Sequence, residues 1–463
     1  MLDKIYDCSP HFIQNLFVSG YNILAYKKRY GGKYKTFRDL YKLNRNLSRE
    51  DLLRSQKSRY KNFIEQAIAN SEFYRKLYSD IENPQDLDNI QRLPIIDKEL
   101  FRTNINDITI KSKKKLVSSK TGGTTGKSLE VHYKEVNLQE RFALLDDFRS
   151  RFGYKLGKKT AWFSGKKILT IKDVNEKKFW KYDYFNKTKY YSTFHLKNNF
   201  LQYYVENLIK FKPKYLVGFP STIAEIARYG LDNNYLFPDN TVKAVFPTAE
   251  NLTKQMRELI EKFFHTAVYN QYASSEGAPF IFECKNGNLH LELQSGVFEV
   301  LDECNNPSTT GRLVVTSFTT EGTPLIRYDI GDSITLKNQN LICSCGNNNP
   351  IVKSINGRVA DYVYSPENGK INIVNIANAI KDVKGIISYQ IIQNEINCLN
   401  FNIIIDKSIY NNEEEKLFKK NWRDRVGDNM EFNINYVNSI NVESSGKHRV
   451  VLNNIKDLIE KTV

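Results

Sequence analysis

The sequence has no run of about 18 apolar residues, the length that a membrane-spanning helix needs, so no such helix is expected. Its N-terminus is apolar in places, but Asp3, Lys4, Asp7 and His11 interrupt it and no small-residue cleavage site follows. A secretory signal peptide is therefore not expected either. Cysteine is scarce, with six in 463 residues, too sparse to read as a disulfide framework. We expect a cytoplasmic protein.

The sequence also lacks an internal repeat and any recognisable nucleic-acid module. Its net charge is +16, from 68 Lys and Arg against 52 Asp and Glu. The lysine runs at 113–115, 158–159 and 166–167 are short and scattered, which favours a generally basic surface over a polyanion site. No nucleic-acid partner is expected. The alternative, a basic nucleic-acid binder, would show salt-sensitive binding independent of ATP.

A Ser-His-Asp triad cannot be argued, because four of the histidines stand alone in the sequence: His132, His195, His265 and His448. A P-loop NTPase is excluded as well. The stretch 118–131, SSKTGGTTGKSLEV, ends its glycine-rich part in Gly-Lys-Ser, but Thr121 stands where a Walker A loop needs its first glycine. The following LEVHY also resembles a strand rather than a helix.

Hydrophobic residues make up 41% of the chain, which indicates a globular protein of more than one domain. Residues 1–110 have a mostly helical pattern. Further on, a strand at 241–246, an amphipathic helix with its apolar stripe from Met256 to Phe264, and a strand at 266–272 predict a doubly wound α/β sheet. Consecutive strands follow at about 288–335, and the last hundred residues read as α+β.

Several motifs in order carry a family resemblance. TGGTTGKSLEV resembles the Ser/Thr/Gly-rich loop of adenylate-forming enzymes, above all the phenylacetate–CoA ligase family and its CapK-like relatives from capsule biosynthesis. NQYASSEGA at 270–278, IRYDIGD at 326–332, NGRVAD at 356–361 and ESSGKHR at 443–449 are similar to the later motifs of that superfamily. LPIIDKELFRTN and FKPKYLVGFPS resemble the CapK-like group in particular.

The resemblance implies a large N-terminal adenylate-forming domain, residues 1–361, built of doubly wound sheets and a β-rich part at about 288–350. The helical segment 1–110 would lead into it. A small mobile α+β domain, residues 362–463, would follow and turn about Asp361 as a hinge.

The resemblance also assigns the nucleotide site. Thr124, Thr125 and Lys127 would hold the β- and γ-phosphates, with Thr125 counted among the catalytic residues. The glycines would let backbone N–H groups reach the anion. The whole cofactor-binding set comprises Thr121, Gly122, Gly123, Thr124, Thr125, Gly126, Lys127, Thr248, Ala249, Glu250, Asn270, Gln271, Tyr272, Asp332, Arg358 and Lys447.

Within that set, Tyr272 would lie against adenine, and residues 246–250 would border it, although a plain strand-to-helix turn explains that segment equally well. Asp332 would accept hydrogen bonds from the ribose, with Arg358 as a second contact. Glu276 would bind magnesium. Lys447 is the key catalytic expectation, because a positive charge there would stabilise the crowded negative charge of the transition state.

A metal site is predicted from Cys284, His290, Cys343 and Cys345, a Cys₃His set typical of a closed structural zinc site. Related ligase-like proteins have a Cys-Pro-Cys-Gly arrangement, in which Ser344 here replaces proline. Four unrelated residues are the alternative, and Cys304 is a spare candidate. No position would be left open for a catalytic zinc.

The function implied is ATP- and magnesium-dependent activation of a small carboxylic acid as an acyl-adenylate, followed by transfer to coenzyme A, a carrier thiol or a sugar amine. The sequences of the motifs are closer to the CapK-like group, which favours surface polysaccharide biosynthesis. The basic charge of the protein would be compatible with work near a membrane surface. An aryl-CoA ligase of catabolism and an inactive polysaccharide-assembly scaffold are the alternatives. Candidates for the acid pocket are Phe163, Ser164, His195 and Ala273. The oligomeric state cannot be read from the sequence.

Overall fold

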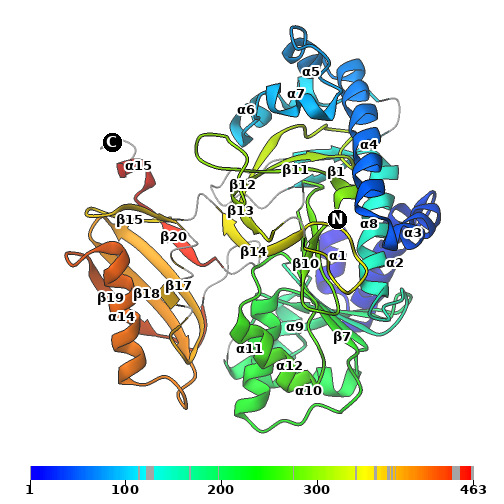
Figure 1. Cartoon of the computed structure of the whole chain (residues 1–463). Helices are drawn as coiled ribbons and strands as arrows, with labels where there is room; N and C mark the ends of the chain where they lie inside the picture. The colour runs from blue at the N-terminus through cyan, green and yellow to red at the C-terminus, as the bar shows by residue number, and fades with distance from the viewer. Residues whose placement is uncertain are drawn as a thin grey trace.

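The fold was taken from a computed structural model (Figure 1). The described residues are 2–112, 115–120, 130–165, 168–196, 198–274, 276–338, 341–358, 362–372, 376, 379–380, 382–440 and 449–459.

Helices dominate the first hundred residues, as the sequence predicted. Capping side chains start several of them: Ser48 accepts a hydrogen bond from the Asp51 N–H at 3.0 Å, and Asp97 accepts one from the Leu100 N–H at 2.7 Å. The segment contains α1 (Leu2–Cys8), α2 (His11–Tyr30), α3 (Tyr34–Leu43), the 3₁₀ turn η1 (Asn44–Asn46), α4 (Arg49–Asn70), α5 (Glu72–Leu77), the 3₁₀ turn η2 (Leu87–Arg92), α6 (Lys98–Thr103) and α7 (Ile105–Ile108).

A five-stranded sheet has the order β4-β5-β3-β6-β7. Its last four strands are parallel, and β4 is an antiparallel edge. The strands are β3 (Thr160–Ser164), β4 (Trp180–Asp183), β5 (Thr188–Ser192), β6 (Tyr215–Gly218) and β7 (Ala244–Pro247). The accompanying helices are α8 (Glu135–Ser150), α9 (Ile171–Asn175), α10 (Asn198–Phe211), α11 (Pro220–Asp232) and α12 (Lys254–Phe264).

Both faces of this sheet are buried, as expected of a doubly wound sheet. Leu216 of β6 packs into a hydrophobic cluster with α10, α11 and α12. Its neighbours Tyr215 and Val217 pack on the other face, with Phe148 of α8. The alternation along β6 therefore places helices on the two sides.

The expected strand at 266–272 is wrong in its extent. Only Val268 bridges in parallel to Val245, and the regular strand that follows is β8 (Gln271–Ala273). The chain changes partner at Asn270, whose backbone N–H donates to the Glu283 carboxylate at 2.7 Å and whose carbonyl accepts from the Glu283 N–H at 2.9 Å. These bonds draw β8 into a second sheet.

That second sheet has seven antiparallel strands in the order β11-β12-β13-β14-β10-β9-β8. The strands after β8 are β9 (Phe280–Glu283), β10 (Leu289–Leu291), β11 (Gly296–Leu301), β12 (Thr310–Ser317), β13 (Tyr328–Leu336) and β14 (Ile351–Arg358), with the 3₁₀ turn η3 (Leu293–Ser295). They agree with the run of consecutive strands predicted from about residue 288. A separate hairpin pairs β1 (Val117–Lys120) with β2 (Glu130–Tyr133).

The C-terminal part has its own sheet and core, drawn in orange and red in Figure 1. Phe401, Phe418 and Trp422 are fully buried at its centre. The four-stranded order is β19-β18-β17-β20, and β15 pairs with β16 beside it. The elements are β15 (Tyr362–Ser365), β16 (Gly369–Asn372), β17 (Ile386–Glu395), β18 (Cys398–Ile405), α14 (Asn412–Val426), β19 (Glu431–Tyr436), β20 (Val451–Asn453) and α15 (Lys456–Ile459).

Among the described residues, no helix combines the length and apolar character that crossing a membrane requires.

Candidate functional site

The predicted phosphate loop falls between β1 and β2 in the sequence. Its residues 121–127 lie outside the described residues, but both strands that flank it are fixed. The Ser118 hydroxyl lies 2.9 Å from Nδ1 of His132 across the hairpin. The His132 backbone N–H donates to the Thr323 hydroxyl at 2.6 Å, which attaches β2 to the turn after β12. The strands on either side of the loop are therefore held in place by the protein.

Two residues expected to bind the nucleoside are in direct contact. Tyr272, on β8, donates a hydrogen bond from its hydroxyl to a carboxylate oxygen of Asp332, on β13. The two residues are 60 positions apart, and three strands separate β8 from β13 in the sheet. Arg358, on β14, is the register partner of Asp332, although its side chain lies outside the described residues. The sheet thus brings the predicted adenine and ribose residues to one place.

The segment after β8 carries Glu276, the predicted magnesium ligand, which is half-buried. Burial raises the pKa of Tyr133, and the nearby Glu276 carboxylate raises it further. Gly277 follows with a φ of +108°, and a Cβ there would lie 2.5 Å from the Thr320 methyl group and 2.9 Å from the Ser317 hydroxyl. Only glycine fits this close approach, so the position of Glu276 is set by the turn that follows it.

The segment after β7 carries the other predicted nucleotide contacts. The Thr248 N–H donates to the Gly218 carbonyl at 2.9 Å, and Ala249 has a φ of +69°. The Glu250 carboxylate accepts from the Ser221 hydroxyl at 2.6 Å. This turn therefore links the ends of β6 and β7, at the edge where ligands of parallel sheets bind.

Asn270 and Gln271 are held by the protein itself. The Asn270 backbone binds Glu283, as described above. The side-chain oxygen of Gln271, which is buried, accepts from Nε of Arg149 at 3.1 Å. Their contacts fix the start of β8 and hence the direction of Tyr272.

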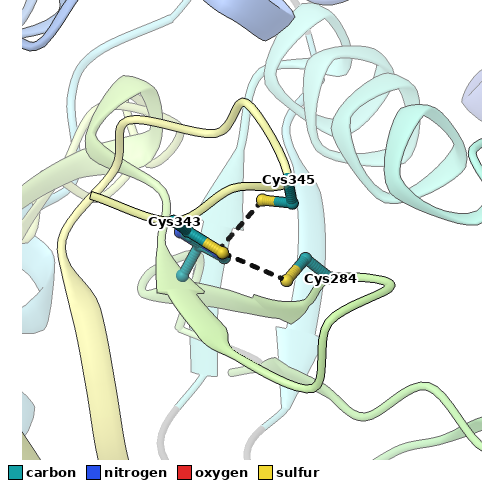
Figure 2. A group of neighbouring side chains, drawn as sticks. Cys284, Cys343 and Cys345 are labelled. Atoms are coloured by element: carbon teal, nitrogen blue, oxygen red, sulfur yellow. Dashed lines mark hydrogen bonds between the residues drawn. The ribbon is translucent and has the colours of Figure 1, made fainter. Parts of the chain in front are cut away.

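The cysteine and histidine residues predicted to bind metal form one cluster. The ligand atoms of Cys284, His290, Cys343 and Cys345 all lie within 4.8 Å of one another. Figure 2 shows the three thiols turned toward a common centre. Sγ of Cys284 and Sγ of Cys343 are 3.8 Å apart, and Sγ of Cys345 is 3.5 Å from Nε2 of His290. The spare candidate Cys304 is exposed and is not part of this group.

The surroundings of His290 suit a ligand role. Nδ1 lies 3.3 Å from the Asn349 carbonyl oxygen, an arrangement that orients Nε2 toward the thiols. Burial lowers the pKa of His290, which favours the neutral imidazole that metals bind. His290 also pairs with Ile351 across β10 and β14, so the cluster joins the β9–β10 hairpin to the strand that leads into the C-terminal domain.

Other predicted residues are dispersed or lie outside the described residues. Lys447 and Asp361 lie outside them, as does the side chain of Ser164. Phe163 is fully buried and stacks on Tyr191 with ring centroids 5.1 Å apart. Ala273 packs against the cluster on the opposite face of the five-stranded sheet.

Nδ1 of His195 lies 2.8 Å from the Ser192 hydroxyl. The structure does not bring Phe163 and Ala273 together, and the four-residue acid pocket stays a prediction.

Sequence reasoning missed two arginines that organise the site. Arg141 donates to the Tyr133 hydroxyl at 2.5 Å and to the Ser274 carbonyl at 2.7 Å, so it holds the chain beside Glu276. Arg149 holds Gln271. Both lie on α8, whose buried side also carries Glu140, Asp146 and Asp147, so no pattern in the sequence singled out the two arginines.

Comparison with known proteins identifies the family. The sequence is 37% identical to Protein CapK of Staphylococcus aureus over 464 residues, which covers 98% of this chain and 100% of that protein. The chain belongs to the CapK family. The CapK C-terminal domain model matches residues 363–454, and the resemblance inferred from the motifs is thereby confirmed.

Solved structures show the fold of this CapK family member. The crystal structure of a 2-hydroxyisobutyryl-CoA ligase in its postadenylation state, in complex with R3-HIB-AMP, superimposes with a TM-score of 0.69 at 16% identity, covering 90% of this chain and 93% of that one. The GH3.15 acyl acid amido synthetase has a TM-score of 0.57 at 13% identity, with coverage of 89% and 94%. The predicted fold, a large N-terminal and a small C-terminal domain of the adenylate-forming type, is confirmed.

Proposed function

We propose that this CapK family member is an ATP-dependent ligase that activates a small carboxylic acid as an acyl-adenylate and transfers the acyl group to an acceptor. The observation that carries the proposal is the contact between Tyr272 and Asp332, with Arg358 in register. Three motifs distant in the sequence meet there, on a fold shared with enzymes that bind acyl-adenylates.

The first step is attack of a carboxylate oxygen on the α-phosphorus of ATP. The bond from that phosphorus to the bridging oxygen breaks, and pyrophosphate leaves with the electron pair. Positioning and charge neutralisation carry such a step, because little proton transfer is involved. Tyr272 would hold the adenine, Asp332 the ribose hydroxyls, and Thr124, Thr125 and Lys127 the β- and γ-phosphates.

Magnesium fits the residues present near Glu276. That carboxylate is half-buried after β8, and carboxylate and phosphate oxygens are the ligands that magnesium prefers. When bound with ATP, the ion would neutralise phosphate charge. Arg141 keeps the Ser274 carbonyl in place and so sets where the Glu276 carboxylate lies.

In the second step, the thiol or amine of the acceptor attacks the carbonyl carbon of the adenylate. AMP leaves with the electron pair of the carbon–oxygen bond, and the acceptor gives up its proton. We propose that the C-terminal domain begins after Asp361, that it turns there between the two steps, and that Lys447 contributes its charge to the first.

We further propose a structural zinc ion in the Cys284–His290–Cys343–Cys345 cluster. Three thiols and one imidazole within 4.8 Å of one another are the donor set of closed, four-coordinate zinc sites. The ion would tie the β9–β10 hairpin to the segment before β14, away from any chemical step.

The acceptor class is proposed from the relatives. A related ligase binds coenzyme A together with 2-HIB-AMP, and another relative is an amido synthetase, so a thiol and an amine are both compatible with the fold. We propose a role in surface polysaccharide assembly, with a sugar amine as the acceptor, because the motifs resemble those of CapK-like proteins of capsule biosynthesis. A catabolic aryl-CoA ligase is the alternative.

The test is ATP–pyrophosphate exchange measured over a panel of carboxylic acids with wild-type protein and Lys447→Ala. Exchange should appear with a subset of acids and fall by at least about a hundredfold in the variant, since a buried transition-state charge contact is worth several kcal/mol. Lys407→Ala, an exposed lysine of the same domain, is the matched control and should leave exchange unchanged. Absence of both exchange and ATP binding in calorimetry would overturn the proposal in favour of an inactive scaffold.

A further inference from the structure

Helix α2 has its polar side toward the protein. Gln14, Asn15, Ser19 and Asn22 are buried along it. They hold the outer edge of the five-stranded sheet: the Asn15 side chain accepts from the Tyr182 N–H at 3.0 Å.

Two more hydrogen bonds extend this polar contact, called the polar seam below. The Ser19 hydroxyl accepts from the Tyr184 N–H at 3.0 Å, and the Asn22 amide donates to Asp183 at 2.8 Å. An edge strand that would otherwise expose its N–H groups is thus covered by amide and hydroxyl side chains.

The opposite side of α2 is apolar and faces solvent. Phe12 is 60% exposed, Leu16 54%, Tyr21 69% and Leu24 67%. Ile23 is exposed as well. At 100° per residue these side chains spread over about half of the helix circumference. Large apolar side chains gathered in this way mark a surface that contacts something else.

Within the α2 segment of the sequence the charges are of one sign, although Asp173 and Asp183 of neighbouring elements contact the buried side of the helix. From residue 8 to residue 38 the sequence contains no Asp or Glu, and it contains six Lys and Arg. Lys27 and Lys28 are exposed in the last turn of α2, and Lys33 and Lys35 are exposed directly after it. Such a segment attracts an anionic surface.

We infer that α2 is a docking face for an anionic lipid bilayer, in which the helix lies flat with its apolar side among the acyl chains. Phenylalanine, leucine and isoleucine on the exposed arc, with lysines beside them, are the composition of interfacial helices. A second copy of this chain would bring the same positive charge to the contact, and a nucleic acid would leave the apolar side chains uncovered. A bilayer satisfies both properties at once.

The polar seam explains how the helix can meet lipid without leaving the protein. The hydrogen bonds of Asn15, Ser19 and Asn22 keep α2 on β4 while its other side is free. In the view of Figure 1 the C-terminal domain is at the left and α2 and α3 are at the right of the large domain. The inference does not depend on the ligase activity.

The test is flotation of the full-length protein with vesicles of phosphatidylcholine alone and vesicles that also contain phosphatidylglycerol. Wild-type protein should float with the anionic vesicles, and added salt should reduce this. Phe12→Ser/Leu16→Ser/Leu24→Ser should weaken the partition coefficient by at least about a hundredfold, and Lys27→Gln/Lys28→Gln by about thirtyfold. The control Leu236→Ser/Ile409→Ser removes two exposed apolar residues, 86% and 47% exposed, from the connection after α11 and from the C-terminal part, and should change nothing.

Light scattering of the same proteins supplies the second readout. The inference predicts that wild type and the triple variant have the same oligomeric state. No flotation by wild type, equal flotation by the triple variant, or an oligomer that the triple variant abolishes would overturn it, and the last result would assign the face to a second copy instead.

Discussion

At the scale of single residues, the Tyr272–Asp332 contact is the feature on which the proposed nucleotide site depends. A tyrosine that stacks on a base and an aspartate that accepts from ribose hydroxyls have to be close, since adenine and ribose are joined. The hydrogen bond between them also fixes the tyrosine ring before ATP arrives. Pre-positioning of this kind lowers the entropy lost on binding.

The two side chains should therefore respond differently to substitution. Tyr272→Phe keeps the ring and loses one hydrogen bond, so kcat/KM for ATP should fall by about fivefold, as a net contribution of ~1 kcal/mol implies. Asp332→Asn removes the charged acceptor for the ribose and should cost about ten- to a hundredfold. Steady-state kinetics with ATP and with 2′-deoxy-ATP measure this. The ratio of kcat/KM for ATP to that for 2′-deoxy-ATP should be larger in wild type than in Asp332→Asn. The same ratio in both proteins would show that Asp332 does not contact the ribose.

Glu225 gives a second prediction at this scale. It lies on α11 beside a cavity of about 140 Å³ that residues of both domains line, and its carboxylate is 3.9 Å from Arg228. Burial raises the pKa of Glu225 from its usual 4.5 to about 7, although Arg228 opposes the rise. The unfolded chain thus loses this proton at a lower pH than the folded protein does.

Stability should consequently fall as pH rises from about 4.5 to about 7, by up to ~3 kcal/mol. Glu225→Gln cannot ionise and should remove this part of the pH dependence of the free energy of unfolding, measured by denaturant titration at several pH values. Glu258→Gln, on an exposed position of α12, is the control and should leave the profile unchanged. If the free energy of unfolding of wild type and Glu225→Gln changed with pH in parallel, the pKa of Glu225 would be the same in the folded and unfolded chain, which would contradict this prediction.

At the scale of elements, the metal cluster shows what spacing can reveal. A Cys-x-Cys pair, a distant cysteine and a histidine, together with the resemblance to a similar arrangement in related ligase-like proteins, predicted the four candidate ligands. The structure brings the same four together. Thiols and an imidazole must lie close together to bind zinc. This requirement makes the residues of such a site easier to predict from sequence than the residues of most surfaces.

We expect purified protein to contain about one zinc ion per chain and to lose thermal stability when Cys343→Ser removes a ligand, since structural zinc contributes folding free energy directly. Metal analysis and thermal unfolding test this together. Cys304→Ser should leave both the zinc content and the melting temperature unchanged, because that thiol is exposed and outside the cluster. A metal-free protein that melts like its Cys343→Ser variant would contradict the zinc assignment.

Other elements could not be predicted. Residues 266–272 have the composition of one strand, but Glu283 pairs with Asn270 from a later hairpin and ends the parallel pairing early. Arg141 and Arg149 gain their importance from tertiary partners that no local pattern announces. Helix α2 is inverted, with amides inside and aromatics outside, so the usual rule that apolar faces are buried points to the wrong side.

At the scale of the whole molecule, the large domain carries most of the residues proposed to bind the nucleotide, and the small domain is proposed to bring Lys447. The two meet at α11, where Arg228 donates to the Asn438 carbonyl at 3.3 Å. Family resemblance predicted this two-domain fold from a few short motifs that follow one another in the expected order. The acid, in contrast, is selected by pocket side chains that a single sequence does not identify.

The most direct measurement follows oxygen atoms. The acid identified by pyrophosphate exchange is labelled with ¹⁸O in its carboxylate, turned over with ATP and the acceptor, and AMP is analysed by mass spectrometry. Attack of the carboxylate on the α-phosphorus predicts that AMP carries one ¹⁸O atom from the acid. Unlabelled AMP, or label in inorganic phosphate, would contradict adenylate formation and with it the proposed function.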